Sequence, residues 1–453
     1  MSKLDLLVRG GKVVRPRIGV VDADVGIRDG RIVLVAEPGL DLEARRTLEV
    51  DGLHVFPGVV DAHAHIGLGG GEEEYQSDTA AAALGGVTAI LYYLIDKNSY
   101  HPAIQEHLNL AQGKVSADFG YHVTLMTEEH MREIPEIVMR WGIKSFKFFM
   151  HFRGDEGLYM GVTGTDDGLL YGMMESIASN DSVLAVHPEN IEIAWLLGRR
   201  LKEAGREDLA AWNESRPPFV EAEAIHRAGF LAAQVGCPLY LVHITSALAL
   251  EEALLLRGRF PNLSLFLETC PHYLTHHDRS EIGVLGKVNP PLRAHADLDP
   301  LWQGVLDGSF DTVGSDHVGR RLEKKQGTVW QASAGFPGMP TLLPVLLSEG
   351  YHKRGLSLER IADLVARRPA EIFKMADRKG DIEVGLDADL AIVDLNWERT
   401  PDADWLGTWS DYTIYDGWSL KGWPRYTILR GEVVQQDGEI QIEPGHGQYI
   451  AHH

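Results

Sequence analysis

Two histidines spaced two residues apart follow an apolar run near the start of the chain. The run covers residues 55–60, and the histidines are His63 and His65 in the sequence DAHAH. Residues i and i+2 of a β-strand point to the same face, so both imidazoles could bind one metal ion at a strand end. The alternative is a strand edge with two solvated histidines. Ligands from other strands are needed to decide between the two.

Other titratable residues end further apolar runs in the same way. His187 ends the run 182–186, His243 ends 239–242, and Asp316 ends 312–315. Imidazole and carboxylate groups are the ligands that bind zinc and similar divalent ions. Each of these residues alone is more often an ordinary core or surface residue. Together with His63 and His65, they predict a metal site if the strand ends meet.

Lys147 lies within another apolar run, between Phe146 and Phe148. An unpaired ammonium is costly to bury in such a strand. Its stem could be buried while its head reaches solvent, or it could pair with a carboxylate such as Asp316. A neutral lysine amine could instead capture carbon dioxide and become a carbamate that bridges two metals. The spacing leaves these alternatives open.

The elements that must position these residues are eight apolar runs separated by stretches of helical character. The expected helices include 77–86, 101–115, 128–141 and 168–179, then several between 190 and 235 that break at Pro217-Pro218. Segments 341–350 and 357–376 would complete the series. Buried strands that alternate with helices indicate a parallel sheet, and eight of them predict a (β/α)8 TIM barrel. The expected strands are 55–60, 88–94, 119–125, 145–150, 182–187, 239–243, 263–268 and 312–316. In such barrels the functional residues lie at the carboxyl ends of the strands, where the titratable residues fall here.

Both ends of the chain are rich in predicted strands. Residues 4–16, 20–38 and 47–56 precede the barrel, and 380–394 and 424–441 follow it. Asp29-Gly30 and Asp437-Gly438 are typical of tight hairpin turns. We therefore predict one small β-sandwich domain built from residues 1–56 and 378–453, beside a barrel domain at 57–377.

Composition indicates a globular protein without a nucleic-acid or membrane partner. Of the 453 residues, 44% are hydrophobic and 24% charged, as in ordinary soluble proteins. A formal net charge of -22 would repel phosphates of nucleic acids and of anionic membranes. Cys237 and Cys270 lie in or beside apolar runs, which predicts buried free thiols. With no signal-peptide pattern at the start and no membrane-spanning run, we expect a cytoplasmic enzyme or scaffold.

The chain resembles the amidohydrolase superfamily, and within it the cyclic amidohydrolases: hydantoinase, dihydropyrimidinase and allantoinase. The resemblance rests on DAHAH at 61–65, SFKFFM at 145–150, AVHPEN at 185–190, LVHITS at 241–246 and GSDH at 314–317. KVNPPLR at 287–293 is similar to the K-x-x-P-P-x-R stretch of these enzymes. GDIEVGLDADLAIVD at 380–394 resembles their return from barrel to sandwich. The motifs cover nearly the whole chain in order.

The resemblance implies two divalent metal ions, with zinc expected first and manganese or cobalt as alternatives. His63, His65 and Asp316 would bind the more buried ion, and His187 and His243 the second. Lys147, as N6-carboxylysine, would bridge both, as would a hydroxide that attacks the substrate. Asp316 would act as general base and then general acid. All six positions are present, which disfavours the non-enzymatic members of the superfamily.

Three departures from the family pattern concern the substrate. Phe152 stands where many hydantoinases and dihydropyrimidinases have a tyrosine that stabilises the oxyanion, so this support would come mainly from the metal, or from another donor such as Tyr159 or His151. Asn289 stands where hydantoinases often have a serine whose backbone contacts the ring. Gly67 replaces the arginine that usually holds the substrate carboxylate in dihydroorotase, which disfavours that activity. We expect the glycines of segment 66–71 to form a flexible connection rather than a lid.

The resulting expectation is a hydrolase that opens a small cyclic amide, most simply a hydantoin-type ureide, with Phe152 and Asn289 at the substrate. Allantoinase and dihydropyrimidinase are the alternatives of the same class. A catalytically silent scaffold is the alternative of another class. The resemblance also implies a homotetramer or a homodimer.

Overall fold

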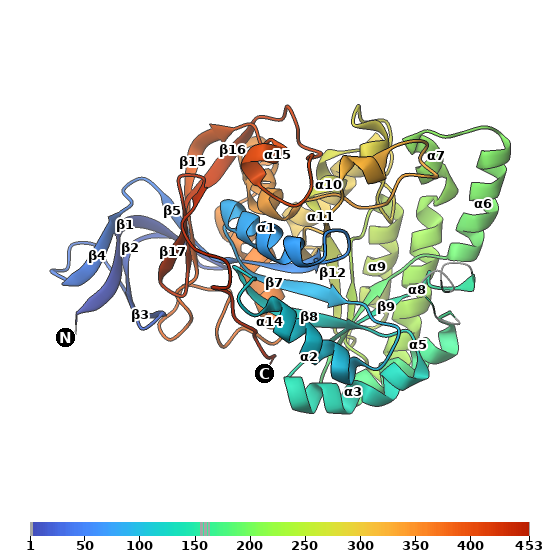
Figure 1. The fold of residues 1–453 in the computed structure, drawn as a ribbon, viewed down its shortest axis with the longest axis horizontal. Coiled ribbons are helices and arrows are strands. Elements are labelled where there is room, and N and C mark those ends of the chain that lie inside the picture. The colour runs from blue at the N-terminus through green and yellow to red at the C-terminus, as the bar shows by residue number, and fades with distance from the viewer. Residues whose placement is uncertain (1–2, 155–156, 158–160, 162–163, 453) are drawn as a thin grey trace.

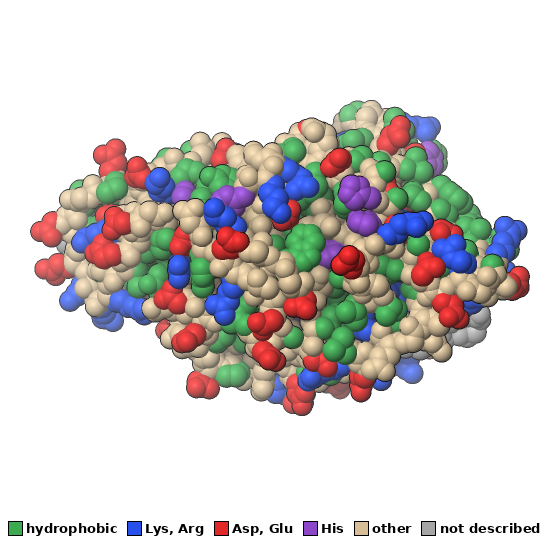
Figure 2. Space-filling model, turned by 90° about the horizontal axis from the view of Figure 1, so that it is seen from above, with side chains coloured by type: hydrophobic (Ala, Val, Ile, Leu, Met, Phe, Trp, Pro, Cys, Tyr) green, Lys and Arg blue, Asp and Glu red, His purple; other side chains and the backbone are tan. Residues whose placement is uncertain are grey.

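The computed structural model describes residues 3–154, 157, 161 and 164–452. It contains a parallel barrel and a separate mixed sheet, which lie beside each other in Figure 1. Acidic and basic side chains are interspersed over the face seen in Figure 2. In the described part of the chain, no helix is both long and apolar enough to cross a membrane. Cys237 and Cys270 are buried free thiols, as predicted.

The barrel is a parallel sheet in which strands that follow one another in sequence are neighbours. The eighth strand is split into β13 and β14, of which β13 pairs with β12 and β14 pairs with β6, so the sheet closes. Segment 314–316 interrupts this strand and contains Asp316. The predicted (β/α)8 barrel is confirmed. Its strands are β6 (Val59–His65), β7 (Val87–Leu94), β8 (Asp118–Thr124), β9 (Ser145–Phe149), β10 (Val183–His187), β11 (Leu239–Leu241), β12 (Leu265–Thr269), β13 (Thr312–Val313) and β14 (His317–Val318).

Helices cover the outside of the barrel, as Figure 1 shows. Helix α1 begins at Glu72 rather than near residue 77, because Glu72, Glu73 and Glu74 favour the positive end of the helix dipole. The predicted break at Pro217-Pro218 separates α7 from α8. The helices through this region are α1 (Glu72–Ala82), α2 (Tyr100–Ala111), α3 (Glu128–Trp141), α5 (Asp167–Ser179), α6 (Ile191–Glu203), α7 (Leu209–Ser215), α8 (Pro218–Val235), α9 (Ala247–Arg259), α10 (Pro271–Thr275) and α11 (Leu298–Asp307).

The last helical part of the barrel differs from the two continuous helices that we predicted. It consists of short α-helical pieces joined by wider π-type turns. The pieces are α12 (Leu342–Val345), α13 (Leu358–Ala362) and α14 (Arg368–Ile372), and the turns are η6 (Leu346–His352) and η7 (Asp363–Arg367). Pro344 and Pro369 lack the backbone N–H that a regular helix uses, which accounts for part of the irregularity.

The second sheet joins the two ends of the chain. Strand β5 pairs with β15 in antiparallel register, with Val55 opposite Ile392. The two predicted hairpin turns are confirmed, since Asp29, Gly30, Asp437 and Gly438 all have positive φ. The strands, in spatial order, are β18 (Glu439–Ile440), β17 (Glu432–Gln436), β16 (Leu420–Leu429), β15 (Leu390–Arg399), β5 (His54–Pro57), β1 (Leu4–Arg15), β2 (Gly19–Arg28) and β3 (Arg31–Ala36), with β4 (Ala44–Glu49) on β1 and the short α15 (Ala403–Leu406) after β15.

The buried apolar side chains of this terminal sheet form one cluster that contains residues from both ends of the chain. They include Val25 and Val55 from the first part and Leu390 and Ile428 from the last. Residues 380–389 precede β15 without forming a strand, which differs from the expected strand 380–394. The domain boundaries at 56/57 and 377/378 stay a prediction.

Candidate active site

The carboxyl ends of the barrel strands open into one cavity of about 390 Å³. This volume is in the range of small-molecule sites. Four of the predicted histidines and Asp316 line the cavity, together with both predicted substrate-binding residues. The lining residues are His63, His65, Leu68, Ile95, Phe149, His151, Phe152, His187, His243, Val288, Asn289, Asp316, Val318, Arg320, Ala334 and Gly335.

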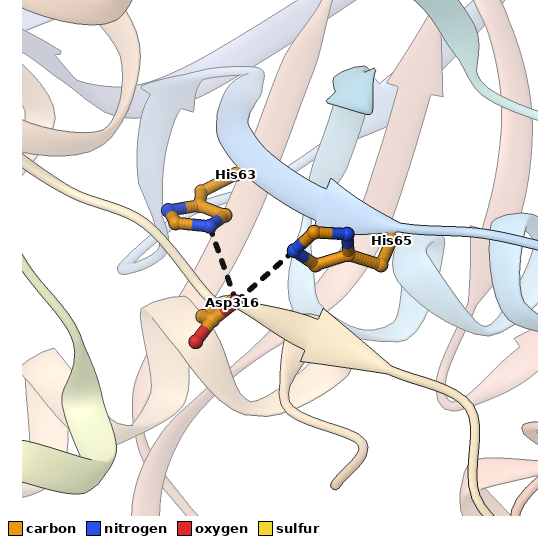
Figure 3. A group of neighbouring side chains, drawn as sticks. All are labelled: His63, His65 and Asp316. Atoms are coloured by element: carbon orange, nitrogen blue, oxygen red, sulfur yellow. Dashed lines mark ion pairs between the residues drawn. The ribbon is translucent and has the colours of Figure 1, made fainter. Parts of the chain in front are cut away.

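His63, His65 and Asp316 form the first candidate ligand group. Figure 3 shows both imidazoles on strand β6 facing the Asp316 carboxylate, which comes from the interruption of the eighth strand. The Nε2 atoms of His63 and His65 lie 3.1 and 3.5 Å from Oδ1 of Asp316. Their ligand atoms all lie within 4.8 Å of one another, a spacing that one metal ion could occupy.

Glu268 lies behind this group at the end of β12. Its Oε1 is 2.6 Å from Nδ1 of His63, the ring nitrogen that faces away from Asp316. Burial alone would lower the pKa of His63, but the carboxylates of Glu268 and Asp316 raise it to about 9. In the same way, burial would raise the pKa of Asp316, but His63 holds it well below its usual value. Asp316 is therefore a carboxylate across the physiological pH range.

His187 and His243 form the second group. Nδ1 of His187 and Nε2 of His243 lie 2.9 Å apart. His151 packs against His187, with ring centroids 4.2 Å apart, and Oε2 of Glu189 lies 3.5 Å from Nε2 of His187. Ligand atoms of His151, His187 and Glu189 also lie within 4.8 Å of one another. The second group thus contains two further possible ligands, His151 and Glu189, besides the predicted histidine pair.

Lys147 is fully buried on β9, and its Nζ has no hydrogen-bond partner among the residues that the structure describes. The nitrogen lies 4.6 Å from the ring centroid of Tyr93 and 4.8 Å from that of Phe149. Burial lowers the pKa of Lys147 to about 7, against the opposing effect of Glu268 and Asp316. A substantial fraction of the amine is therefore neutral near neutral pH, the form that reacts with carbon dioxide.

The backbone at two of these positions is strained. His243 and Asp316 have φ values of 40° and 47°, in the left-handed region that residues other than glycine rarely adopt. Such conformations cluster at functional sites, where the surrounding structure enforces them. The backbone N–H of His243 donates to Oε1 of Glu268 at 2.9 Å, and the N–H of Ser315 donates to Oδ1 of Asp61 at 3.0 Å. These bonds help to fix the direction of both side chains.

The donor set fits two divalent ions. Imidazole nitrogens and a carboxylate converge on one position, and two further imidazole nitrogens converge on a second. Nζ of buried Lys147 has no hydrogen-bond partner among the described residues. A carboxyl group on this nitrogen would add two oxygen atoms that can bind metal. Without a cation, these groups would be a set of buried polar atoms with incomplete partners, which is unfavourable.

The residues predicted to face the substrate lie in the cavity wall. The Phe152 ring stacks on Phe149 at a centroid distance of 4.5 Å and gives the wall an apolar surface. Oδ1 of Asn289 is buried and has no hydrogen-bond partner in the described part of the protein. His151 also lines the cavity, whereas Tyr159, the other candidate for the missing hydroxyl, lies outside the described residues.

The glycine-rich segment 66–71 differs from the flexible connection that we expected. The backbone N–H groups of Gly67, Gly69 and Gly70 all donate to the buried carboxylate of Glu74, at 2.5 Å for Gly67 and 2.7 Å for Gly69. The glycines allow the backbone to wrap closely around the anion. The segment thus has a defined shape and presents Leu68 at the mouth of the cavity.

Sequence reasoning missed two buried carboxylates of the site, Glu268 and Glu189. Both could have been found from the strand-end pattern, since Glu268 ends the expected strand 263–268 and Glu189 follows His187 by two residues. Tyr93, which contacts both His63 and His65, gave no such signal because it reads as an ordinary core residue of β7.

Comparison with known proteins gives the same assignment as the motifs. Residues 242–434 match the family model described as "Amidohydrolase family". The chain is 34% identical to L-hydantoinase of Paenarthrobacter aurescens, over 98% of each chain. It is 38% identical to the allantoinase of Rubrobacter xylanophilus, over 99% of this chain and 98% of the relative.

Comparison with solved structures gives the same family. The L-hydantoinase (dihydropyrimidinase) of Arthrobacter aurescens superposes with a TM-score of 0.92 at 32% identity, over 98% of this chain and 99% of the other. The similarity extends over nearly the whole chain at these identities, and the barrel and its strand-end residues are present. These findings establish the family. The chain belongs to the amidohydrolase family and is a hydrolase of its cyclic-amide branch, alongside the hydantoinases and allantoinases.

Proposed function

We propose that the protein hydrolyses a ring amide of a hydantoin-type ureide with the help of two divalent metal ions. The observation that carries the proposal is the convergence of His63, His65 and Asp316 on one position and of His187 and His243 on another. Lys147, as N6-carboxylysine, is the bridging ligand of the proposal. Zinc is the first candidate metal, with manganese or cobalt as alternatives.

When bound, such ions lower the pKa of water and polarise the carbonyl group that is attacked. Ring opening adds a hydroxyl group to the carbonyl carbon, breaks the bond to the ring nitrogen and places a proton on that nitrogen. In the proposed mechanism, Asp316 takes the proton from the attacking water and then gives it to the leaving nitrogen. His63 holds the pKa of the Asp316 carboxyl well below its usual value, so the group is ionised and has a lone pair available for the first of these roles.

The carbonyl oxygen gains negative charge in the transition state and needs a hydrogen-bond donor. Phe152 offers no donor, so we assign this role to the imidazole of His151, which lines the cavity next to His187. Phe152 and Asn289 complete the substrate contacts of the proposal. The stacked Phe149 and Phe152 would contact an apolar part of the substrate, and the Asn289 amide, whose Oδ1 is buried, would contact polar groups of the ring.

Allantoin is the second candidate substrate. The observation that favours it is the 38% identity with an allantoinase over nearly the whole chain. Dihydropyrimidines are a third candidate of the same reaction class, because the similar L-hydantoinase of Arthrobacter aurescens is also named a dihydropyrimidinase.

A substrate screen tests the proposal. The purified protein is loaded with zinc, manganese or cobalt in the presence of bicarbonate. It is then assayed with hydantoin, 5-alkyl and 5-aryl hydantoins, dihydrouracil, allantoin and simple cyclic imides. We expect ring-opened N-carbamoyl products from hydantoins. Activity confined to allantoin would replace the first substrate by the second, and a protein that binds no divalent ion and opens none of these rings would be a scaffold instead.

The location and assembly of the enzyme belong to the same proposal. Buried free thiols at Cys237 and Cys270 fit a reducing compartment, and we assign the protein to the cytoplasm as a homotetramer or homodimer. Sedimentation of the metal-loaded protein distinguishes these assemblies from a monomer.

A further inference from the structure

Glu189 follows the strand-end residue His187 by two residues and has no part in the proposed ligand set. We propose that Glu189, held in place by Arg216, is the positioning residue of the second metal site: it orients the His187 imidazole so that Nδ1 faces His243. The inference rests on the two-ion site of the proposed function and adds a residue that controls its second half.

The two nitrogens of His187 face different partners. Nδ1 is 2.9 Å from Nε2 of His243, while Nε2 is 3.5 Å from Oε2 of Glu189. An imidazole that binds a metal through one nitrogen carries a proton on the other, and the partner of that N–H fixes the tautomer and the ring orientation. Glu189 lies on the Nε2 side of His187 at ion-pair distance, without a hydrogen bond in this structure. Its carboxylate favours a proton on Nε2, which leaves Nδ1 as the nitrogen with a free lone pair.

The carboxylate of Glu189 is itself fixed. Its exposed fraction is only 2%, and Oε1 lies 3.1 Å from Nε of Arg216. The Arg216 guanidinium stacks on the Trp212 ring at 3.7 Å, and the backbone carbonyl of Arg216 accepts a bond from the Arg293 guanidinium. The Arg216 guanidinium at this distance favours the ionised carboxylate.

The first half of the site has a matching carboxylate. Glu268 faces Nδ1 of His63 at 2.6 Å, and it also accepts the Tyr240 hydroxyl at 2.7 Å. The nitrogen of His63 that points into the site is again the one opposite the carboxylate. Glu268 is therefore the outer carboxylate of the first half, although its Oε1 also accepts the backbone N–H of His243 from the second half.

A competing interpretation makes Glu189 a ligand rather than a positioning residue. His151, His187 and Glu189 lie close enough to hold an ion of their own. The Arg216 guanidinium, 3.1 Å from the carboxylate, opposes this, because it would repel a cation at that position. The number of ions that the wild-type chain binds separates the two interpretations.

The experiment is a cobalt titration of the full-length, metal-free protein in bicarbonate, followed by visible absorption and by metal analysis. The variants are Glu189→Gln and Glu268→Gln, with Glu203→Gln, an exposed residue of α6, as the matched control. We expect Glu189→Gln to weaken the second ion about 10- to 100-fold and to leave the first at wild-type affinity. Glu268→Gln should weaken the first ion and, through its bond to the His243 backbone N–H, also affect the second, whereas Glu203→Gln should change neither.

The affinity of the Glu189→Gln variant for the first ion serves as an internal check on folding, because it is measured in the same sample. If that variant does not fold, Arg216→Gln replaces it. This change leaves Glu189 in place but removes its anchor, and a smaller weakening of the second ion is expected.

Three results would overturn the inference. Wild-type affinity for both ions in Glu189→Gln and in Arg216→Gln would remove the positioning role, as would equal weakening of both ions. A third cobalt ion in the wild type that Glu189→Gln loses would make Glu189 a ligand. Failure of the proposed function looks different, since the wild-type protein would then bind no pair of ions at all.

Discussion

At the scale of single residues, Lys147 distinguishes a metal centre from an ordinary barrel core. A lysine amine without exposure and without a hydrogen-bond partner in the described residues is unfavourable by itself. The Lys147 nitrogen lies 4.6 Å from the ring centroid of Tyr93 and 4.8 Å from that of Phe149. Conversion to a carbamate removes the positive charge and supplies two oxygen ligands. The proposed metal site would therefore account for an amine buried at this position.

We predict that Lys147→Ala lowers the rate of ring opening by more than about 100-fold, since loss of a ligand exceeds the usual effect of an outer-shell change. The rate is measured with the best substrate of the screen, and metal content is measured in the same samples. Lys144→Ala removes a lysine with an exposed fraction of 22% near the other end of β9 and serves as the control. Unchanged turnover in Lys147→Ala would remove the carbamate from the proposal.

At the scale of secondary-structure elements, loops and caps decide how the strand ends are used. The segment between β6 and α1 wraps around the Glu74 carboxylate, so the helix supplies the anchor of the loop that precedes it. In the same way, His276 at the end of α10 ties this helix to the segment before β16. Its Nε2 donates to the carbonyl of Ile414 at 3.0 Å.

The loop prediction concerns Glu74→Gln. An uncharged amide accepts these three N–H groups less well than a carboxylate, and hydrogen bonds to charged groups contribute about 1.5–3 kcal/mol. We therefore expect the amides of Gly67, Gly69 and Gly70 to exchange with solvent at least about tenfold faster. Hydrogen exchange with mass spectrometry measures this. Glu72→Gln, on the exposed side of the same turn, should leave the exchange rates unchanged, and equal rates in both variants would contradict the anchor.

The pH prediction concerns His276, which is distant in the chain from the predicted ligands. Burial lowers its pKa to about 4 in the folded protein, whereas an unfolded histidine titrates near 6.5. As the pH falls from about 7 towards 4, the unfolded chain binds a proton that the folded chain does not, so the free energy of unfolding decreases.

Urea unfolding at pH 7 and pH 5 measures this dependence. We expect the decrease to be smaller in His276→Gln, whose amide can still donate to Ile414 but does not titrate. His226→Gln, a variant of a largely exposed histidine on α8, is the control. The same pH dependence in His276→Gln and in the wild type would contradict the assignment.

At the scale of the whole molecule, a terminal sheet and a barrel share one chain that crosses between them twice. Buried charges link the two parts: Nζ of Lys379 lies 2.6 Å from Asp118 on β8 and 3.0 Å from Asp387 before β15. The carboxylates of Asp118, Asp387 and Asp389 are close enough to one another to hold a metal ion. The Lys379 ammonium already occupies this position. We therefore interpret this cluster as a structural network of ion pairs and not as a further metal site.

Metal removal is predicted to destabilise the whole chain. Ions that bind only the folded state raise the free energy of unfolding by an amount that grows with their concentration, about 2.7 kcal/mol at 100 times the dissociation constant. We expect chelation to lower the midpoint of thermal unfolding, and zinc with bicarbonate to restore it. Lys147→Ala is the control and should show a smaller shift. Equal midpoints for metal-free and metal-loaded wild type would contradict a resident metal pair.

Much of this protein was predictable because its barrel follows local rules. Alternation of apolar strands and helices indicated the barrel, and the strand-end rule indicated His63, His65, His187, His243 and Asp316. The hairpins at Asp29-Gly30 and Asp437-Gly438 followed from turn residues alone. Element ends were less accurate, as the early start of α1 and the π-type turns near Pro344 and Pro369 illustrate.

The sequence by itself determined the fold class, the family and the residues that could bind metal, because these depend on residue type and on spacing along one element. Only the tertiary structure decided which groups meet. It placed Glu268 behind His63 and Glu189 behind His187, and it closed the glycine segment around Glu74. It also split the eighth strand at Asp316. These contacts join residues from different elements, and their distances depend on packing that no local pattern encodes.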